Sequence, residues 1–295
     1  MKSNAAALPV DRTRGADYVA LAKPRLNGLV VASTLAGYVM AGGNTADVVR
    51  VCCTVLGTFL VAGGASAFNQ ILERDTDGLM RRTKMRPLPD GRLQSFEAFV
   101  FGTILTVAGL MVLGFGANPL SALVAFATLA SYAVIYTPLK RRTSFATVIG
   151  AIPGALPPVI GWAAGRNEVS QGAWVLFGIV FLWQLPHFLA IAWIFREDYA
   201  RAGLQMLPVI EPDGRSTARQ SVVYSAALLP LAMAPTLLGM TATAYFIGAF
   251  LLTSALLVLA IRFSADRSTL AARRLFFGSI VYLPVLWILM IADRH

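Results

Sequence analysis

The sequence predicts an all-α membrane protein in which nine transmembrane helices are bundled around a central cavity open to the cytoplasmic face. Three observations predict this class. The 295-residue chain is 57% hydrophobic and only 14% charged, which leaves too few polar residues to cover an ordinary solvated surface. Its uncharged apolar runs are long enough to cross about 30 Å of hydrocarbon. These runs lack the alternation of barrel strands, so in lipid they must be helices.

Nine apolar runs account for the nine helices in chain order. They are Leu26–Gly43, Val51–Leu72, Ala98–Ala117, Leu120–Tyr136, Phe145–Ala164, Ala173–Phe195, Ser221–Gly239, Thr241–Ile261 and Leu275–Ala292. The fifth run contains Pro153, Pro157 and Pro158. Proline removes a backbone donor and kinks a helix, which is tolerated where the broken backbone is buried in protein or lines a cavity. This run therefore predicts either a pocket wall or a packing kink.

Basic residues orient these helices in the membrane. If the N-terminus is cytoplasmic, the cytoplasmic segments hold all of the 25 Lys and Arg residues except Arg50, Arg166 and Arg294. This distribution satisfies the positive-inside rule and places the C-terminus outside. The net charge of +10 then serves orientation and contact with membrane lipid headgroups, so nucleic acid is not an expected partner.

The chain divides into a cytoplasmic N-terminal segment, residues 1–25, and a single transmembrane domain, residues 26–292. The outer connections are brief, whereas the two longest connections, about residues 73–95 and 196–220, lie on the cytoplasmic side. Loops carried by a rigid scaffold are where binding and catalytic residues concentrate. We therefore expect function at the cytoplasmic face.

The first long loop begins within the stretch AFNQILERDTDGLMRRTKMRPLPDG, residues 67–91. If the second helix continues past Leu72, then Asn69, Glu73 and Asp77 fall four residues apart on one face. Clustered carboxylates near hydrocarbon require a cation. Amide and carboxylate oxygens suit Mg²⁺, which commonly binds through a few carboxylates together with substrate phosphates.

Basic residues follow these carboxylates closely. They are Arg81, Arg82, Lys84 and Arg86. Their side chains are good donors to phosphate oxygens, so the stretch as a whole predicts a diphosphate site with its metal ion. The alternative is a solvated loop that is basic because of topology and acidic by chance, and this is our expectation for Asp90 and Arg92.

These residues resemble the UbiA-type intramembrane prenyltransferases, whose first signature is an Asn followed by acidic residues at four-residue spacing. The longer string NQILERDTDGLMRRTKMRPLP is similar to the branch of that family that farnesylates haem. The resemblance covers nearly the whole chain through LAKPR at 21–25, YTPLKRRT at 136–143, WQLPHF at 183–188 and DYARAGLQMLP at 198–208. The chain departs from the family pattern at Glu73, which replaces an Asp, and at Ala202, which replaces the second Asp of the second acidic motif.

The resemblance implies transfer of a farnesyl group from farnesyl diphosphate to a vinyl group of haem B in a bacterial inner membrane, with Mg²⁺ as cofactor. The metal ligands would be Asn69, Glu73 and Asp77, which are also the catalytic residues, and Asp198, with Glu197 as a neighbour able to help. The residues that would bind the diphosphate are Lys23, Arg25, Arg81, Arg82, Lys84, Arg86, Lys140 and Arg141. Tyr136 and Asp75 would line the pocket. For Lys23 and Arg25 the alternative role is that of topology anchors.

His187 lies near the middle of the sixth run, where an ionisable side chain is a candidate for function. Imidazole is the common axial ligand of haem iron, so His187 is a candidate haem contact. The alternative is a neutral histidine that is hydrogen-bonded between helices.

Other functions remain open at this point. A UbiA-type enzyme could instead prenylate a quinone precursor or a chlorophyll-like acceptor, because the diphosphate chemistry is shared. Nine spans with intramembrane polar residues could also form a secondary transporter, although the charges cluster at one face and no duplicated halves are visible. A haem A synthase is a possible protein partner that would take up the product.

Overall fold

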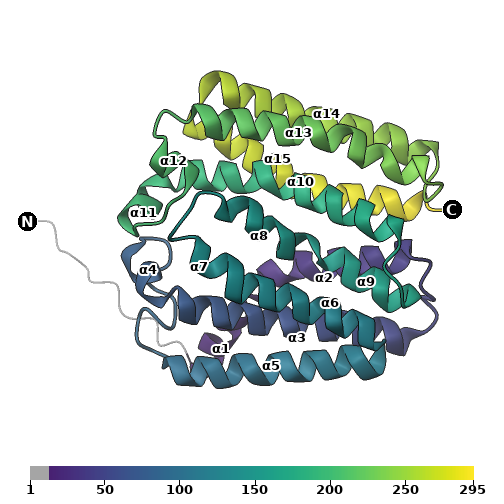
Figure 1. Cartoon of the computed structure of the whole chain (residues 1–295), viewed down its shortest axis with the longest axis horizontal. Coiled ribbons are helices and arrows are strands. Elements are labelled where there is room, and N and C mark those ends of the chain that lie inside the picture. The colour runs from purple at the N-terminus through teal and green to yellow at the C-terminus, as the bar shows by residue number, and fades with distance from the viewer. Residues whose placement is uncertain (1–12) are drawn as a thin grey trace, which may run out of the picture.

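The computed structural model describes residues 13–295, which form a bundle of helices (Figure 1). The long helices are α2 (Pro24–Met40), α3 (Val48–Leu72), α5 (Ser95–Gly116), α6 (Pro119–Ala130), α8 (Ala146–Ala155), α9 (Pro157–Arg166), α10 (Gln171–Ile194), α13 (Arg215–Leu237), α14 (Thr243–Asp266) and α15 (Thr269–Ala292). The short ones are α1 (Arg14–Ala22), α4 (Arg74–Leu79), α7 (Thr137–Leu139), α11 (Arg196–Arg201) and α12 (Leu207–Ile210). One π-helix, η1 (Ser131–Tyr136), joins α6 to α7. The prediction of an all-α class is confirmed.

Eight segments within residues 13–295 are long and apolar enough to cross a membrane. They are Val48–Leu72, Ser95–Gly116, Pro119–Leu139, Ala146–Arg166, Gln171–Ile194, Arg215–Leu237, Thr243–Asp266 and Thr269–Ala292. Each coincides with one of the nine predicted runs. The remaining run, predicted at Leu26–Gly43, forms α2, which has only 17 residues. The chain is a multi-pass membrane protein with eight spans of full length.

The proline-rich span is broken at Leu156 into α8 and α9. Helix α9 lies directly against α2, and the contact requires glycine at position 161, because a Cβ atom there would overlap the carbonyl oxygen of Thr34. On the other half of the span, the side-chain amide of Gln184 in α10 donates to the Ala151 carbonyl at 2.7 Å. These contacts are those of a packing kink, one of the two predicted alternatives.

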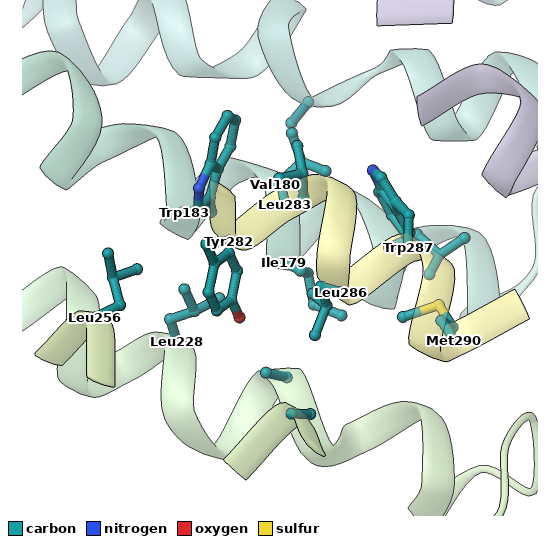
Figure 2. Packing of buried hydrophobic residues seen from close by; sticks show 14 of the residues in the cluster. Ile179, Val180, Trp183, Leu228, Leu256, Tyr282, Leu283, Leu286, Trp287 and Met290 are labelled. Carbon is teal, nitrogen blue, oxygen red and sulfur yellow. The ribbon is translucent and has the colours of Figure 1, made fainter. Parts of the chain in front are cut away.

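The main core lies where α10, α13, α14 and α15 meet (Figure 2). Leu228, Leu256 and Leu286 are almost completely buried there. Two polar groups of this core are paired: the Trp183 indole donates to the Ser279 carbonyl at 2.8 Å, and the Tyr282 hydroxyl lies 2.9 Å from that of Thr253. The paired groups avoid the several kcal/mol that an unsatisfied polar group costs in hydrocarbon.

The short helices gather at one end of the bundle. In Figure 1, α4, α11 and α12 lie together at the left end, opposite the C-terminus. They belong to the two long connections that the sequence assigns to function, after α3 and after α10. The long helices thus serve as a rigid scaffold for one loop-rich end.

Candidate active site

The predicted ladder of Asn69, Glu73 and Asp77 is present, although α3 ends before it does. Glu73 is the C-cap residue of α3 and also the N-cap residue of α4. Helical hydrogen bonds cross this junction, from the Glu73 amide to the Asn69 carbonyl at 2.9 Å and from the Asp77 amide to the Glu73 carbonyl at 2.7 Å. Four-residue spacing therefore still places the three side chains along one side of the chain.

Three basic residues from three separate segments of the chain meet this ladder. Lys140 Nζ lies 2.6 Å from Glu73 Oε1, and an Arg86 guanidinium nitrogen lies 2.6 Å from Asp77 Oδ2. Lys23 Nζ lies 3.4 Å from Asn69 Oδ1. Each oxygen side chain of the ladder thus has one cationic partner, so donors for phosphate and oxygens for metal occupy the same site.

Asp77 carries the feature that fits a metal ion. Its side chain is 1% exposed, and its Oδ1 atom has no hydrogen-bond partner. A buried carboxylate oxygen without a partner is costly, and a cation would satisfy it. Within residues 13–295 no group of three His, Cys, Asp or Glu side chains forms a complete metal site. A metal ion here would need the Asn69 amide and oxygens of a bound diphosphate to complete its coordination, as is usual for Mg²⁺.

Burial and neighbouring charges shift the pKa values of Glu73 and Lys23. Burial alone would raise the pKa of Glu73, but the nearby charge of Lys140, its hydrogen bond and the charge of Lys23 hold that pKa below its usual value. Burial, followed by the charge of Arg86, lowers the pKa of Lys23 to about 7. Glu73 therefore stays ionised and available to a cation, whereas Lys23 is poised to take up a proton when an anion binds.

The turn between α1 and α2 positions Lys23. This residue has a left-handed backbone with φ of 48°, which costs a non-glycine residue about 1 kcal/mol or more and persists only where other contacts hold it. Two side-chain amides supply such contacts: Gln70 donates to the Leu21 carbonyl at 2.9 Å and Asn27 to the Ala22 carbonyl at 2.6 Å. The turn places Lys23 beside the ladder.

The π-helix η1 positions Lys140. Its wider turn ends just before Pro138, and the Thr137 hydroxyl donates to the Tyr132 carbonyl at 2.9 Å. The Asn69 amide donates in turn to the Thr137 hydroxyl at 3.4 Å, which directs Asn69 Oδ1 away from Thr137. Lys140 Nζ lies 4.5 Å from the centre of the Tyr136 ring. Single π turns inside α-helices are frequent at functional sites.

A cavity of about 260 Å³ opens beside these residues. It is lined by Leu72, Glu73, Thr76, Thr137, Pro138, Lys140, Arg141, Arg142 and Leu204. The lining combines carboxylate, ammonium and guanidinium groups with apolar side chains. Such a lining suits a ligand with an anionic head and an apolar tail.

The other predicted site residues occupy more open positions at this end. Arg25, Asp75, Arg81, Arg82, Lys84 and Arg141 are exposed. The guanidinium carbon of Arg82 lies 4.9 Å from the centre of the Phe195 ring, which fixes it near α11. The structure therefore brings Lys23, Arg86 and Lys140 to the carboxylates and leaves the remaining cations at the rim.

Asp198, the predicted fourth metal ligand, lies on α11 and belongs to the second acidic motif. Its Oδ1 atom accepts from Arg201 at 2.8 Å and from the Arg81 amide at 3.5 Å, so α11 touches the loop that follows Asp77. Glu197 is exposed. Ala202 lies in an apolar cluster with Met80 and Leu204, where a carboxylate would be buried without a partner. The chain presents one acidic ligand candidate at this position.

Sequence reasoning missed one contributor to this end of the protein. Arg92 was expected to be a solvated loop residue, and this expectation is wrong. Its Nε atom donates to both carboxylate oxygens of Asp17 in α1, at 3.0 and 3.2 Å, and another of its nitrogens donates to the Met85 carbonyl at 3.1 Å. It also pairs with Asp90. Arg92 thereby ties α1 to the loop that carries Arg86, and only the folded contact reveals it.

His187 lies away from this ladder, on the side of α10 that faces α15. Its Nδ1 atom lies 2.8 Å from the Ser279 hydroxyl, and its ring stacks with Trp183 at a centroid distance of 5.5 Å. The Phe276 ring lies 5.0 Å from it. His187 is half-buried, so it is hydrogen-bonded between helices and still partly accessible.

Comparison with known proteins identifies the family of this chain. The model of the UbiA prenyltransferase family matches residues 30–281. A protein of Solibacter usitatus, named protoheme IX farnesyltransferase, is 47% identical over 287 residues, covering 94% of this chain and 98% of the relative. The protein of the same name from Opitutus terrae is 42% identical over 290 residues, and the match covers 97% of this chain and 97% of the relative.

Solved structures show the same fold at lower identity. A digeranylgeranylglyceryl phosphate synthase superposes with a TM-score of 0.79 at 16% identity, over 94% of this chain and 97% of its own. A UbiA homologue from Archaeoglobus fulgidus, bound to GPP and Mg²⁺, superposes with a TM-score of 0.61 at 17% identity, over 94% and 99%. These two likenesses concern the arrangement of the helices.

Proposed function

Because this chain belongs to the UbiA prenyltransferase family, we propose that it transfers the farnesyl group of farnesyl diphosphate to a vinyl group of haem B, giving haem O. The observation that carries the proposal is the ladder of Asn69, Glu73 and Asp77, with one cation against each side chain. The choice of acceptor rests on relatives named protoheme IX farnesyltransferase that are similar over nearly their full length. The resemblance of the sequence to the haem-farnesylating branch points the same way.

The residues of the ladder would hold the diphosphate end of the substrate. Asn69, Glu73 and Asp77 would supply oxygens to Mg²⁺, with Asp198 as a candidate fourth ligand, and the homologue solved with GPP and Mg²⁺ supports this cofactor. Bound Mg²⁺ would act as a Lewis acid that neutralises charge on the departing diphosphate. Lys23, Arg86 and Lys140 would donate to phosphate oxygens as the carbon–oxygen bond breaks. The exposed arginines and Lys84 would receive the substrate at the rim.

The acceptor step conserves atoms and charge in a simple way. As the allylic carbon–oxygen bond breaks, the diphosphate keeps the electron pair and the farnesyl carbon becomes electron-poor. The vinyl group of haem B supplies the electron pair for the new carbon–carbon bond. Water then adds to the resulting cation and loses a proton, which leaves a hydroxyethylfarnesyl side chain. The long connections, residues 73–95 and 196–220, would be the active-site loops.

We extend this proposal to topology. Helix α2 begins directly after Lys23, which lies beside the end of α3. At its other end the Val39 carbonyl accepts a hydrogen bond at 3.1 Å from Arg294, which follows α15. Helix α2 therefore connects the same two ends of the bundle as the 25-residue α3 does. Seventeen residues of helix are about 26 Å long, close to the lower limit for a span. With α2 as a ninth crossing, the N-terminus is cytoplasmic and the C-terminus lies outside a bacterial inner membrane.

The direct test is to supply membranes that contain this protein with haem B, farnesyl diphosphate and Mg²⁺, and to resolve the pigments by mass. We expect a haem heavier by one farnesyl group and one water. Omitting Mg²⁺ with a chelator present is the control. Prenylation of 4-hydroxybenzoate with haem left unchanged would contradict the proposed acceptor and favour the quinone branch. Transfer of the product to a haem A synthase is a separate proposal, tested by co-purification of the two proteins.

A further inference from the structure

The contacts of His187 bear on which of its two ring nitrogens carries the proton. The Ser279 hydroxyl on α15 lies 2.8 Å from His187 Nδ1 on α10. The same hydroxyl donates to the Phe276 carbonyl at 2.7 Å. Ser279 is completely buried, so no water competes for its oxygen. These two contacts form a short chain of three groups.

The chemistry of the three groups allows one arrangement in which both contacts are hydrogen bonds. A carbonyl oxygen can only accept, and a hydroxyl has a single proton to donate. Both contacts are hydrogen bonds at the same time only if Ser279 donates to Phe276 and its oxygen accepts from His187. In that arrangement Nδ1 is the protonated atom, and in a neutral ring Nε2 then carries a free lone pair.

The surroundings of the ring leave that lone pair available. No other residue within 13–295 forms a hydrogen bond with Nε2, and His187 is only half-buried. Around the ring lie Trp183, Phe188 and Phe276, with ring centres 5.0 to 5.7 Å from that of His187. A planar macrocycle would find aromatic faces here as well as a nitrogen ligand.

We propose that Ser279 is a positioning residue that keeps His187 in its Nδ1-protonated form, so that Nε2 can bind the iron of a porphyrin. Histidine ligands of metals commonly donate their other N–H to a fixed acceptor, which sets the tautomer and strengthens the ligand. The assignment of the proton stands on the hydrogen bonds alone. The iron ligation rests on the proposed function, because it requires haem B as the acceptor.

Nitrogen NMR of the purified protein, without haem or farnesyl diphosphate, tests the tautomer. The chain contains only two histidines, so His295→Gln leaves a single labelled ring to observe. We expect Nδ1 to be protonated and Nε2 to be unprotonated. Ser279→Ala should move the population toward the Nε2-protonated form, and Ser279→Thr, which retains the hydroxyl, should restore the original spectrum. A protonated Nε2 in the parent protein, or an unchanged spectrum in Ser279→Ala, would overturn the proposal.

Haem B titration monitored by absorption tests the ligand. We expect Ser279→Ala to weaken haem binding about 10-fold and His187→Ala to remove the spectral signature of axial imidazole. Ser225→Ala is the matched control, because Ser225 is also buried and also donates to a carbonyl of its own helix, at 2.8 Å. Identical haem spectra for the parent and His187→Ala would overturn the ligand role. That result would leave the farnesyl transfer assay, which measures the proposed function, unaffected.

Discussion

Arg86 binds only one of the two carboxylate oxygens of Asp77: its guanidinium lies 2.6 Å from Oδ2, while Oδ1 is buried and has no partner. The pair thus holds the carboxylate in place and leaves one oxygen for a further ligand. Glu73 is held in a similar way by Lys140. Breaking a buried pair by removing one partner costs about 3–5 kcal/mol, so these cations stabilise the ladder before any substrate arrives.

Asp77 is the most direct test of the metal site. Asp77→Ala removes the oxygen that lacks a partner in the structure and leaves Arg86 uncompensated. Metal stabilisation of a leaving group is worth several kcal/mol, so we expect farnesyl transfer to fall about a hundredfold or more. Asp77→Asn keeps one oxygen ligand, and excess Mg²⁺ should partly rescue it. The measurement is the rate of haem O formation as a function of Mg²⁺ concentration.

Glu168→Ala is a suitable control for Asp77→Ala, since Glu168 is exposed and forms only a loose 3.8 Å pair with Arg166. It should turn over at the parent rate. A double change of Glu73 and Asp77 should not respond to Mg²⁺ at all. If Asp77→Ala expresses normally and matches the parent rate, the metal site is not at this ladder.

A change at Lys140 should alter the pH dependence of the reaction. Burial favours the protonated form of Glu73, and Lys140 counteracts it, so the pKa of Glu73 lies below its usual value. In Lys140→Met burial prevails and that pKa rises. Protonated Glu73 cannot bind a cation, so the acid limb of the activity profile should move to higher pH. The profile of kcat/KM between about pH 5 and pH 8 reports this movement.

Lys140→Arg and Arg141→Met are the comparisons for that profile. Lys140→Arg keeps a positive charge near Glu73 and should leave the acid limb near its original position. Arg141 is exposed and forms no pair with Glu73, so Arg141→Met should lower the rate without moving the limb. An acid limb that stays in place in Lys140→Met would show that Lys140 does not control the ionisation of Glu73.

The spacing of the ladder was predictable because it depends on one local property, the period of a helix. The partners of the ladder were not, because Lys23, Arg86 and Lys140 reach it from three separate segments, and only folding shows which cation meets which carboxylate. A basic loop residue looks the same in sequence whether it is solvated or buried, which is why Arg92 was misjudged. The contact between His187 and Ser279 joins α10 to α15, two segments far apart in the chain, so no local sequence pattern could predict it.

Lys23 should take up a proton when diphosphate binds. Its pKa is lowered to about 7 by burial and by Arg86, so at pH 8 most of the free protein has a neutral Lys23. An anionic ligand favours the charged form and raises that pKa, and linkage then requires net proton uptake on binding. Calorimetry of inorganic diphosphate with Mg²⁺, in buffers of different ionisation enthalpy, measures this number of protons.

Lys23→Arg is the reference for the calorimetry, because arginine stays charged at pH 8 and the protonation of diphosphate itself cancels in the difference. The parent protein should take up more protons than Lys23→Arg at pH 8. At pH 6 both side chains are charged, so the difference should vanish. Equal uptake by the two proteins at pH 8 would mean that Lys23 does not change its charge when diphosphate binds.

Arg92 should be important for stability because of its contact with Asp17. The Asp17 side chain is 3% exposed and the Arg92 side chain 25%, so Arg92→Ala leaves a nearly buried carboxylate without its cation. We expect a loss of at most about 3 kcal/mol, since a fully buried pair costs about 3–5 kcal/mol to break and water still reaches part of Arg92. Asp17→Asn combined with Arg92→Gln removes both charges and should lower stability less than Arg92→Ala does.

Arg166→Ala is the control, because it breaks an exposed ion pair and should change stability little. Thermal unfolding of the four proteins in the same detergent orders them, and a midpoint for Arg92→Ala equal to that of Arg166→Ala would show that the bond between α1 and the loop contributes nothing.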